Sequence, residues 1–316
     1  MRKELVWAGA IGITFGLVIA FGVWRINSSL KSKTNKTEAT PLPAQNQEFK
    51  IGLNKPENDD VVTQDSVTVS GITKPGVLVS FSGEENDYIV ASADNGIFEE
   101  EVALIPGVNQ IKITAFDPEG LKSTEKVLVV FSSSFKEKSV PTPVPDSSAS
   151  AESDIRERVA QKVAEAMNKP KAYIGVVTDI ADSTIQIKNQ KSEIKQIAVI
   201  ADETAVVNTV KGANKIVKLT DIAIGDFIVA MGYINGNSVL NSQRILIADP
   251  VTEPLVSAVS GNGTDITPSR NTLVFVFSEG KVTKSKASTI EDESKVIYVT
   301  QEEEEKASIR TVFVVQ

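Results

Sequence analysis

Carboxylates are the side chains of this sequence whose type and spacing could do chemistry. The chain has no His and no Cys, which excludes imidazole bases, thiolate nucleophiles and the usual zinc and copper ligands. Acidic residues gather in turn-like stretches whose hard oxygens would suit calcium: Asp59-Asp60 with Asp65, Glu84-Glu85 with Asp87, and Asp117 with Glu119. None has the spacing of a recognised calcium loop, so solvated turns are the competing interpretation. Asp117 and Glu119 are the candidate metal ligands.

Other motifs give weaker indications of catalysis. Glu99 and Glu101 would share one strand face, as the paired carboxylates of a glycosidase require, but that face points outward and no cleft is indicated. Ser133 to Lys136 fits S-x-x-K in its letters, yet it opens a polar linker that would not hold a lysine rigidly. Gly261 to Gly263 lacks the strand and helix of a phosphate-binding loop. The sequence predicts no catalytic residue, no cofactor and no enzyme activity.

The overall charge argues against nucleic acid as a partner. The 316 residues include 33 basic and 41 acidic side chains, which gives a net charge of −8 and repels phosphates. Aromatic residues make up 6% of the chain, so few rings are present on which bases could stack. We therefore expect no binding of nucleic acid.

The elements that position the first acidic groups are short strands, and the overall fold class is expected to be mainly β. Alternation of apolar and polar residues predicts an Ig-like β-sandwich over residues 48–132. Turns are expected at Gly76, Gly96, Gly107 and Gly120, each next to Pro, Asn or Glu. The predicted strands are Phe49 to Leu53, Ser66 to Ile72, Val77 to Ser82, Tyr88 to Ser92, Ile97 to Ala103, Asn109 to Phe116 and Glu125 to Phe131.

The stretches VTVSGITKPGVLVSF and GIFEEEVALIPGVNQIKITAFDPEG give this region a family resemblance. Over about residues 49–131 the sequence resembles bacterial Ig-like modules, including the glucodextranase-type accessory domain. Such modules are mostly spacers or adhesive units, so the resemblance implies architecture more than activity. The residues that carry it are Val69, Gly71, Thr73, Pro75, Gly76, Val79, Phe98, Val102, Leu104, Gly107, Asn109, Ile111, Ile113, Ala115, Asp117 and Gly120.

A second β-module is predicted over residues 170–249. In LTDIAIGDFIVAMG, Asp221 is expected to begin a tight turn, Ile222 and Ile224 to insert under the sheet, and Gly225 to take a positive φ before a buried strand. Together with GVVTDIADSTIQIK, the stretch resembles a family of small OB-like β-barrel domains of unassigned function, over about residues 171–248. Such a barrel implies an oligosaccharide-binding face as a further interpretation.

An internal repeat points to a third module. GVVTDIADSTI, from Gly175 to Ile185, returns as GKVTKSKASTI, from Gly280 to Ile290. The first is expected to form a hairpin, with Ile185 and Ile187 in the core. Residues 250–316 are therefore predicted to be a partial second copy of the β-module, completed by Leu255 to Val259 and Leu273 to Phe277.

The N-terminal sequence determines the expected location. Leu5 to Trp24 is twenty uncharged residues, about 30 Å of helix and one bilayer crossing. Residues 1–26 are predicted to be a cytoplasmic stub and transmembrane anchor; a cleaved signal peptide is the alternative. A stalk (27–47), a Pro/Ser linker (133–153) and a short amphipathic helix (154–169) separate the modules. The helix could pack on the following module or self-associate.

These observations together predict a single-pass bacterial cell-envelope protein whose N-terminus is cytoplasmic and whose body is extracytoplasmic. Its expected role is that of a non-enzymatic spacer, adhesive or scaffold. The alternative is a module that binds cell-wall or other polysaccharide and serves a separate enzyme. The expected partners are the membrane, through Leu5 to Trp24, and cell-wall polysaccharide or other envelope proteins.

Overall fold

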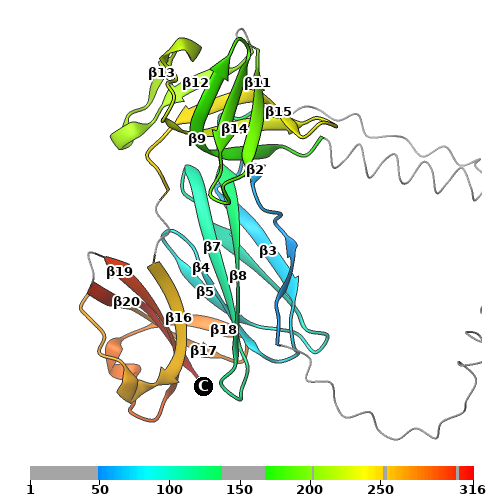
Figure 1. Cartoon of the computed structure of the whole chain (residues 1–316). Coiled ribbons are helices and arrows are strands. Elements are labelled where there is room, and N and C mark those ends of the chain that lie inside the picture. The colour runs from blue at the N-terminus through cyan, green and yellow to red at the C-terminus, as the bar shows by residue number, and fades with distance from the viewer. Residues whose placement is uncertain (1–48, 137–167, 201–202, 252–254, 304–305) are drawn as a thin grey trace, which may run out of the picture. The chain divides into compact units, whose positions relative to one another are not determined.

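The structure is a computed structural model that describes residues 49–136, 168–200, 203–251, 255–303 and 306–316. The described chain is mainly β, as predicted, with strands running from blue near residue 50 to red at the C-terminus (Figure 1). The described residues contain no helix that is long and apolar enough to cross a membrane. The predicted transmembrane helix lies outside the described residues, as does nearly all of the predicted amphipathic helix.

Residues 51 to 131 form a sandwich of two sheets. One sheet has the order β1-β3-β6, and the other contains the run β2-β8-β7-β4-β5. Inward-facing side chains of both sheets, including Val69, Phe98, Phe81 and Ile113, share one buried cluster. The strands are β1 (Gly52–Lys55), β2 (Asp60–Val62), β3 (Ser66–Ile72), β4 (Leu78–Ser82), β5 (Asp87–Ala91), β6 (Ile97–Ala103), β7 (Gly107–Phe116) and β8 (Lys122–Phe131).

The alternation pattern located most of these strands. The bounds of β3 and β6 are as predicted, and the other five predicted strands overlap observed ones. Gly76, Gly96 and Gly120 lie in turns with positive φ, as predicted, and Gly107 has a positive φ at the first residue of β7. The prediction of seven strands missed β2, a three-residue strand that pairs in parallel with β8.

Residues 171 to 247 form the predicted small β-barrel. Its strands close a circuit, because β9 pairs with β10, β10 with β11, β11 with β15, β15 with β14, and β14 with β9. The β11–β15 pair is parallel. The strands are β9 (Lys171–Ala181), β10 (Thr184–Lys188), β11 (Ile194–Val199), β14 (Phe227–Ile234) and β15 (Val239–Ile247), with β12 (Ala205–Asn208) and β13 (Lys215–Val217) extending the sheet beyond β15.

The turn that enters β14 has most of the predicted features. The 3-10 helix η2 (Leu219–Asp221) leads into buried Ile222, and Gly225 has a φ of +97°. The Asp226 carboxylate accepts a hydrogen bond of 2.8 Å from the Ala223 N–H, which closes the turn before β14. The prediction for Ile224 was wrong, because that side chain is 66% exposed.

Residues 255 to 315 form a separate five-stranded sheet, the C-terminal sheet, with the order β16-β19-β20-β17-β18. The predicted segments Leu255 to Val259 and Leu273 to Phe277 are strands of it. The strand order differs from that of the barrel. The last barrel strand, β15, pairs in parallel with the third strand of the circuit, β11. The last strand of the C-terminal sheet, β20, pairs in parallel with the second strand of that sheet, β17. The strands are β16 (Leu255–Asn262), β17 (Leu273–Ser278), β18 (Lys281–Ser285), β19 (Lys295–Glu303) and β20 (Lys306–Val315), and two 3-10 helices, η3 (Gly263–Asp265) and η4 (Ala287–Thr289), lie between strands.

The repeated sequence takes different structural roles in its two occurrences. Gly175 lies inside β9, where a Cβ atom would come within 2.3 Å of the Lys188 carbonyl oxygen. Gly280 instead has a φ of +74° in the β17–β18 turn. The first occurrence is a hairpin with Ile185 and Ile187 buried, as expected, whereas the second runs from a strand into η4. The prediction of a partial structural copy was therefore wrong.

Candidate functional site

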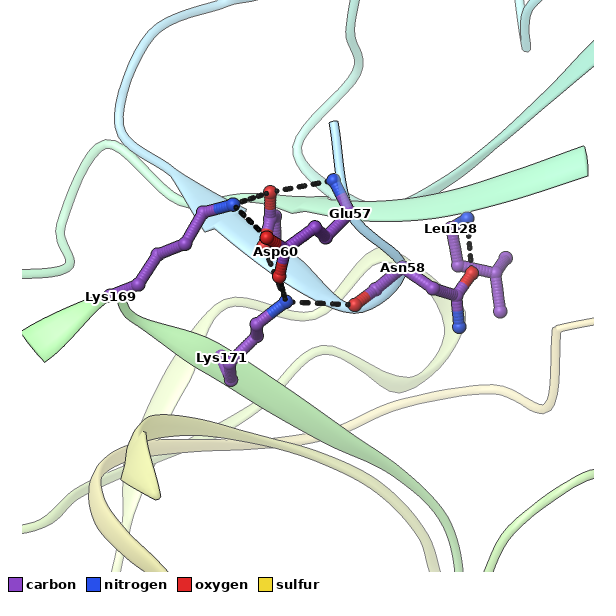
Figure 2. Close-up of polar contacts among 6 residues, drawn as sticks. All are labelled: Glu57, Asn58, Asp60, Leu128, Lys169 and Lys171. Atoms are coloured by element: carbon purple, nitrogen blue, oxygen red, sulfur yellow. Dashed lines mark hydrogen bonds and ion pairs between the residues drawn. The ribbon is translucent and has the colours of Figure 1, made fainter. Parts of the chain in front are cut away.

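Four charged side chains meet where the sandwich contacts the barrel, and we call them the junction cluster: Glu57, Asp60, Lys169 and Lys171. Figure 2 shows the two lysines reaching the carboxylates that flank the start of β2. The ammonium groups of Lys169 and Lys171 lie 2.8 Å and 2.7 Å from the carboxylate oxygens of Asp60, whose side chain is 6% exposed. Lys171 also lies 2.7 Å from a Glu57 carboxylate oxygen.

The backbone around β2 brings these side chains together. The Asp59 N–H donates to the Leu128 carbonyl of β8, while the Asp59 carbonyl accepts from the Ala172 N–H of β9. The Val61 N–H donates to the Pro170 carbonyl at 3.1 Å. This short segment is therefore hydrogen-bonded to the sandwich on one side and to the barrel on the other, which makes the two modules part of one sheet.

The ion pairs shift the pKa values of Glu57 and Lys171 in the direction that keeps these two groups charged. Hydrogen bonding and charge from Lys171 hold the pKa of Glu57 below its ordinary value. Burial acts to lower the pKa of Lys171, but the carboxylates of Asp60 and Glu57 outweigh burial and raise it. Opposite charges at these distances favour the ionised forms.

Apolar packing lies beside the junction cluster. Val61 and Val130 of the sandwich, and Phe135 just after it, share one buried cluster with Val229 and Met231 of the barrel. The Phe135 and Tyr233 ring centroids are 6.1 Å apart. Because buried apolar area is the main source of stability in such contacts, this junction has the composition of a domain core.

A cleft of about 370 Å³ opens beside the junction cluster, between Tyr173, Asp59 and the β10–β11 turn. The Tyr173 hydroxyl donates a 2.8 Å hydrogen bond to the Ser238 carbonyl, and the Lys195 ammonium lies 5.9 Å from the Tyr173 ring centre. Lys195 also pairs with Glu193 at 2.9 Å. Burial raises the pKa of Asp59. The polar groups that line the cleft mostly satisfy one another, because Tyr173 bonds to Ser238 and Lys195 pairs with Glu193.

A second junction joins the sandwich to the C-terminal sheet. The Asp87 carboxylate, which is fully buried, accepts hydrogen bonds from the Arg310 guanidinium and, at 2.6 Å, from the Thr311 hydroxyl. Arg310 also donates to the carbonyls of Gly83 and Glu84, at 3.0 and 3.1 Å. Apolar side chains from both sides pack beside this pair: Ile89, Phe116, Val256, Ala258, Phe277, Ile297, Val299 and Phe313.

The predicted metal ligands Asp117 and Glu119 occupy the β7–β8 turn. One Asp117 carboxylate oxygen lies 2.6 Å from the Lys74 ammonium, and the other accepts a 2.8 Å hydrogen bond from the Glu119 N–H. Lys74 lowers the pKa of Asp117. Across the described residues, no three acidic side chains gather as a metal site would require. Lys74 therefore occupies the position that a cation would take, and calcium binding stays a prediction.

The other acidic candidates are dispersed. Glu99 and Glu101 lie on the exposed face of β6, as predicted, and Glu101 accepts a 2.6 Å hydrogen bond from Ser66. Two candidates assigned to solvated turns, Asp60 and Asp87, instead have their carboxylates buried in the two junctions. Sequence reasoning missed their partners, since Lys171 lies 114 residues from Glu57, and Arg310 lies 223 residues from Asp87. No local pattern links residues that far apart.

Comparison with known proteins leaves the family open. No family model matches the chain, and no curated protein matches it. A tetra-tandem repeat from a large adhesion protein is 10% identical, with 84% of this chain and 72% of that chain covered and a TM-score of 0.23. A Ca²⁺-stabilised, ice-binding adhesin of an Antarctic bacterium is 15% identical, covering 84% and 74%, with a TM-score of 0.21.

A Bacteroides ovatus glucan-utilisation protein, solved with a mixed-linkage heptasaccharide, is 10% identical, covering 89% and 71%, with a TM-score of 0.20. All three scores are far below the level at which two chains share an overall fold. The functional argument for this chain therefore rests on its own geometry.

Proposed function

We propose that this protein is a non-enzymatic, membrane-anchored envelope protein whose extracytoplasmic β-modules act as a rigid spacer or scaffold. The observation that carries the proposal is β2, whose backbone hydrogen bonds continue the sandwich sheet into the barrel. Flexible tethering would leave the faces of neighbouring modules polar and solvated. Here both junctions contain buried apolar clusters and buried carboxylates, which favours a fixed arrangement.

We also propose that the sandwich is an Ig-like module, that the barrel is an OB-like domain, and that both lie outside the cytoplasm. The sandwich supports the Ig-like interpretation, and the pairing order of the barrel, with its parallel third and fifth strands, supports the OB-like one. The uncharged stretch from Leu5 to Trp24 supports the anchor and the extracytoplasmic body.

Spin-label distance measurements test the rigidity. Because the chain has no natural cysteine, Lys122→Cys with Lys215→Cys would place one label on the exposed sandwich surface and one on the exposed barrel surface. We expect a distance distribution as narrow as that of a control pair within the sandwich, Lys122→Cys with Lys50→Cys. A broad distribution across the junction, with a narrow one in the control, would contradict a rigid spacer.

Polysaccharide binding is the second candidate function, and the cleft beside Tyr173 favours it. An aromatic ring and amide side chains, such as those of Asn189 and Gln190, line this space, and this combination suits sugar rings and their hydroxyls. Binding of purified wall polysaccharide to the full chain, compared with Tyr173→Ala, tests this function. Equal binding by the two proteins, or none by either, would leave the scaffold as the only supported role.

A further inference from the structure

Arg244 carries a positive charge at the sandwich–barrel junction, where residues of both modules line a cavity with it. It lies in β15, opposite Met231 of β14 and Ala205 of β12. Leu246 and Met231 belong to the apolar cluster between the two modules. The strand order therefore places a guanidinium beside apolar packing, where charged groups are unfavourable unless they are paired.

The Arg244 guanidinium has no partner among the described residues. Its Nε atom is buried and makes no hydrogen bond, and none of the ion pairs of the described chain includes it. Burial lowers the pKa of Arg244, but an arginine side chain keeps its charge at any physiological pH. A charge that is partly removed from water and left without a counterion is unfavourable, and a bound anion would compensate it.

Two adjoining cavities meet at this guanidinium. Arg244 and Ser134 line both the larger, of about 570 Å³, and the smaller, of about 300 Å³. Lys136, Glu203 and Gln243 also line the smaller cavity. The Gln243 Oε1 atom is buried and accepts no hydrogen bond. One unsatisfied donor and one unsatisfied acceptor therefore belong to two neighbouring residues that line the same cavity.

We propose that these cavities bind a hydroxylated monocarboxylate, such as a uronic acid unit of an acidic saccharide, with its carboxylate on Arg244. The planar guanidinium fork matches the two oxygens of a carboxylate. A neighbouring hydroxyl of the ligand donates to Gln243 Oε1, and the Lys136 ammonium adds positive charge. The site is independent of the scaffold role, which requires no ligand.

The surrounding carboxylates favour a ligand with one negative charge. Glu203 lines the smaller cavity and Asp249 the larger one. Asp249 is already hydrogen-bonded, since it accepts from the Lys211 N–H at 2.7 Å. A phosphate dianion would be repelled by both acidic side chains more strongly than a monoanionic carboxylate would, so inorganic phosphate is the discriminating comparison.

Calorimetric titration of the detergent-solubilised full chain at low ionic strength tests the site, with galacturonate, galactose, acetate and inorganic phosphate as probes. We expect galacturonate to bind saturably, acetate to bind more weakly and galactose not to bind. Arg244→Met should reduce galacturonate affinity about tenfold or more, as loss of a charged hydrogen bond does. Gln243→Leu should weaken galacturonate binding but leave acetate binding unchanged. Arg270→Met, at an exposed arginine in the turn before β17, should change nothing.

Several results would overturn the proposal. Galacturonate could fail to bind the unmodified chain, or bind Arg244→Met with unchanged affinity. Phosphate could bind as tightly as galacturonate, which would make the site a general anion site. Each variant's melting temperature is measured alongside, because a folded Arg244→Met protein is needed for the comparison; removal of an unpaired buried charge is expected to leave stability equal or higher.

Discussion

The two junctions of the sandwich differ in how they are built. On the barrel side, backbone hydrogen bonds through β2 accompany the junction cluster and the apolar contacts. On the side of the C-terminal sheet, side chains make the junction, and in the described chain no β-ladder crosses it. Arg310 is the main polar link there, helped by a 2.6 Å hydrogen bond from Lys112 to the Val256 carbonyl.

This difference indicates which substitutions should destabilise each junction. Backbone ladders do not depend on any one side chain, so the barrel junction should tolerate single substitutions. The other junction concentrates its polar contacts on one buried carboxylate, Asp87, which has no access to water. Loss of its partner leaves a buried charge uncompensated, which is among the most costly changes in a protein.

Removal of the Arg310 guanidinium should have the largest effect. We expect Arg310→Met to reduce the free energy of unfolding of the C-terminal sheet by about 3–5 kcal/mol, because Asp87 then remains buried without a counterion. Denaturant unfolding should change from one transition to two as the sheet undocks before the sandwich unfolds.

The double variant Arg310→Met with Asp87→Leu serves as the matched control. Replacing both charges with apolar groups should recover most of the lost stability. Should the double variant be as unstable as Arg310→Met alone, packing rather than charge would account for the loss.

Asp60→Asn should have a smaller effect on the barrel junction. We expect a loss of about 1–3 kcal/mol, the scale of charged hydrogen bonds, because Lys169 and Lys171 keep partial access to water. Unfolding should remain a single transition, since the β2 ladder stays in place. Asp65→Asn, at an exposed carboxylate nearby, is the control. If the sandwich and the barrel unfolded separately in Asp60→Asn, the β2 ladder would not be what couples the two modules.

The junction cluster also gives the barrel junction a pH dependence at both extremes. The raised pKa of Lys171 means that its contribution is complete below 10.5 and is lost as pH rises beyond that value. The lowered pKa of Glu57 means that its contribution is present above 4.5 and is lost as pH falls below it.

Denaturant midpoints measured across the pH range check both signs. Lys171→Met should flatten the alkaline decrease relative to the unmodified chain, and Glu57→Gln should flatten the acid decrease. Identical alkaline profiles for Lys171→Met and the unmodified protein would show that the lysine charge does not stabilise the junction.

Calcium should have the smallest effect, although Asp117 lies next to Phe116 of the second junction. Lys74 already pairs with Asp117, so we expect the melting temperature to stay unchanged when calcium or a chelator is added. A calcium-dependent increase, abolished in Asp117→Asn, would show that a cation displaces Lys74 and strengthens that junction.

Local patterns were sufficient to predict much of the fold. Alternation located β3 and β6 to the residue, and the turn glycines lie where a positive φ is needed. The buried strand β14 followed from an unbroken apolar run. These features depend on residues close in sequence, so the amino-acid sequence alone is enough to predict them.

Contacts between distant segments were not predictable in the same way. Asp60 lies in a run of acidic and amide residues typical of a turn, yet partners on β8 and β9 make it the first residue of a strand. The position of Arg244 at the junction was not predictable either. Alternation of apolar and polar residues predicts which face of a strand a residue occupies, but it does not predict which other segment packs on that face. The repeated sequence led to a wrong prediction of a structural copy for a related reason. Gly175 and Gly280 are the same residue type, but their surroundings in the structure differ.

The position of β2 has a practical consequence for dissecting the molecule. A protein shortened to residues 49–136 would retain the sandwich but uncover Val61, Val130 and Phe135 and leave the backbone edge of β2 unpaired. A protein that begins at residue 168 would uncover the matching barrel surface and the edge of β9. Free edges beside apolar surface promote aggregation, so the two modules should be purified together or not at all.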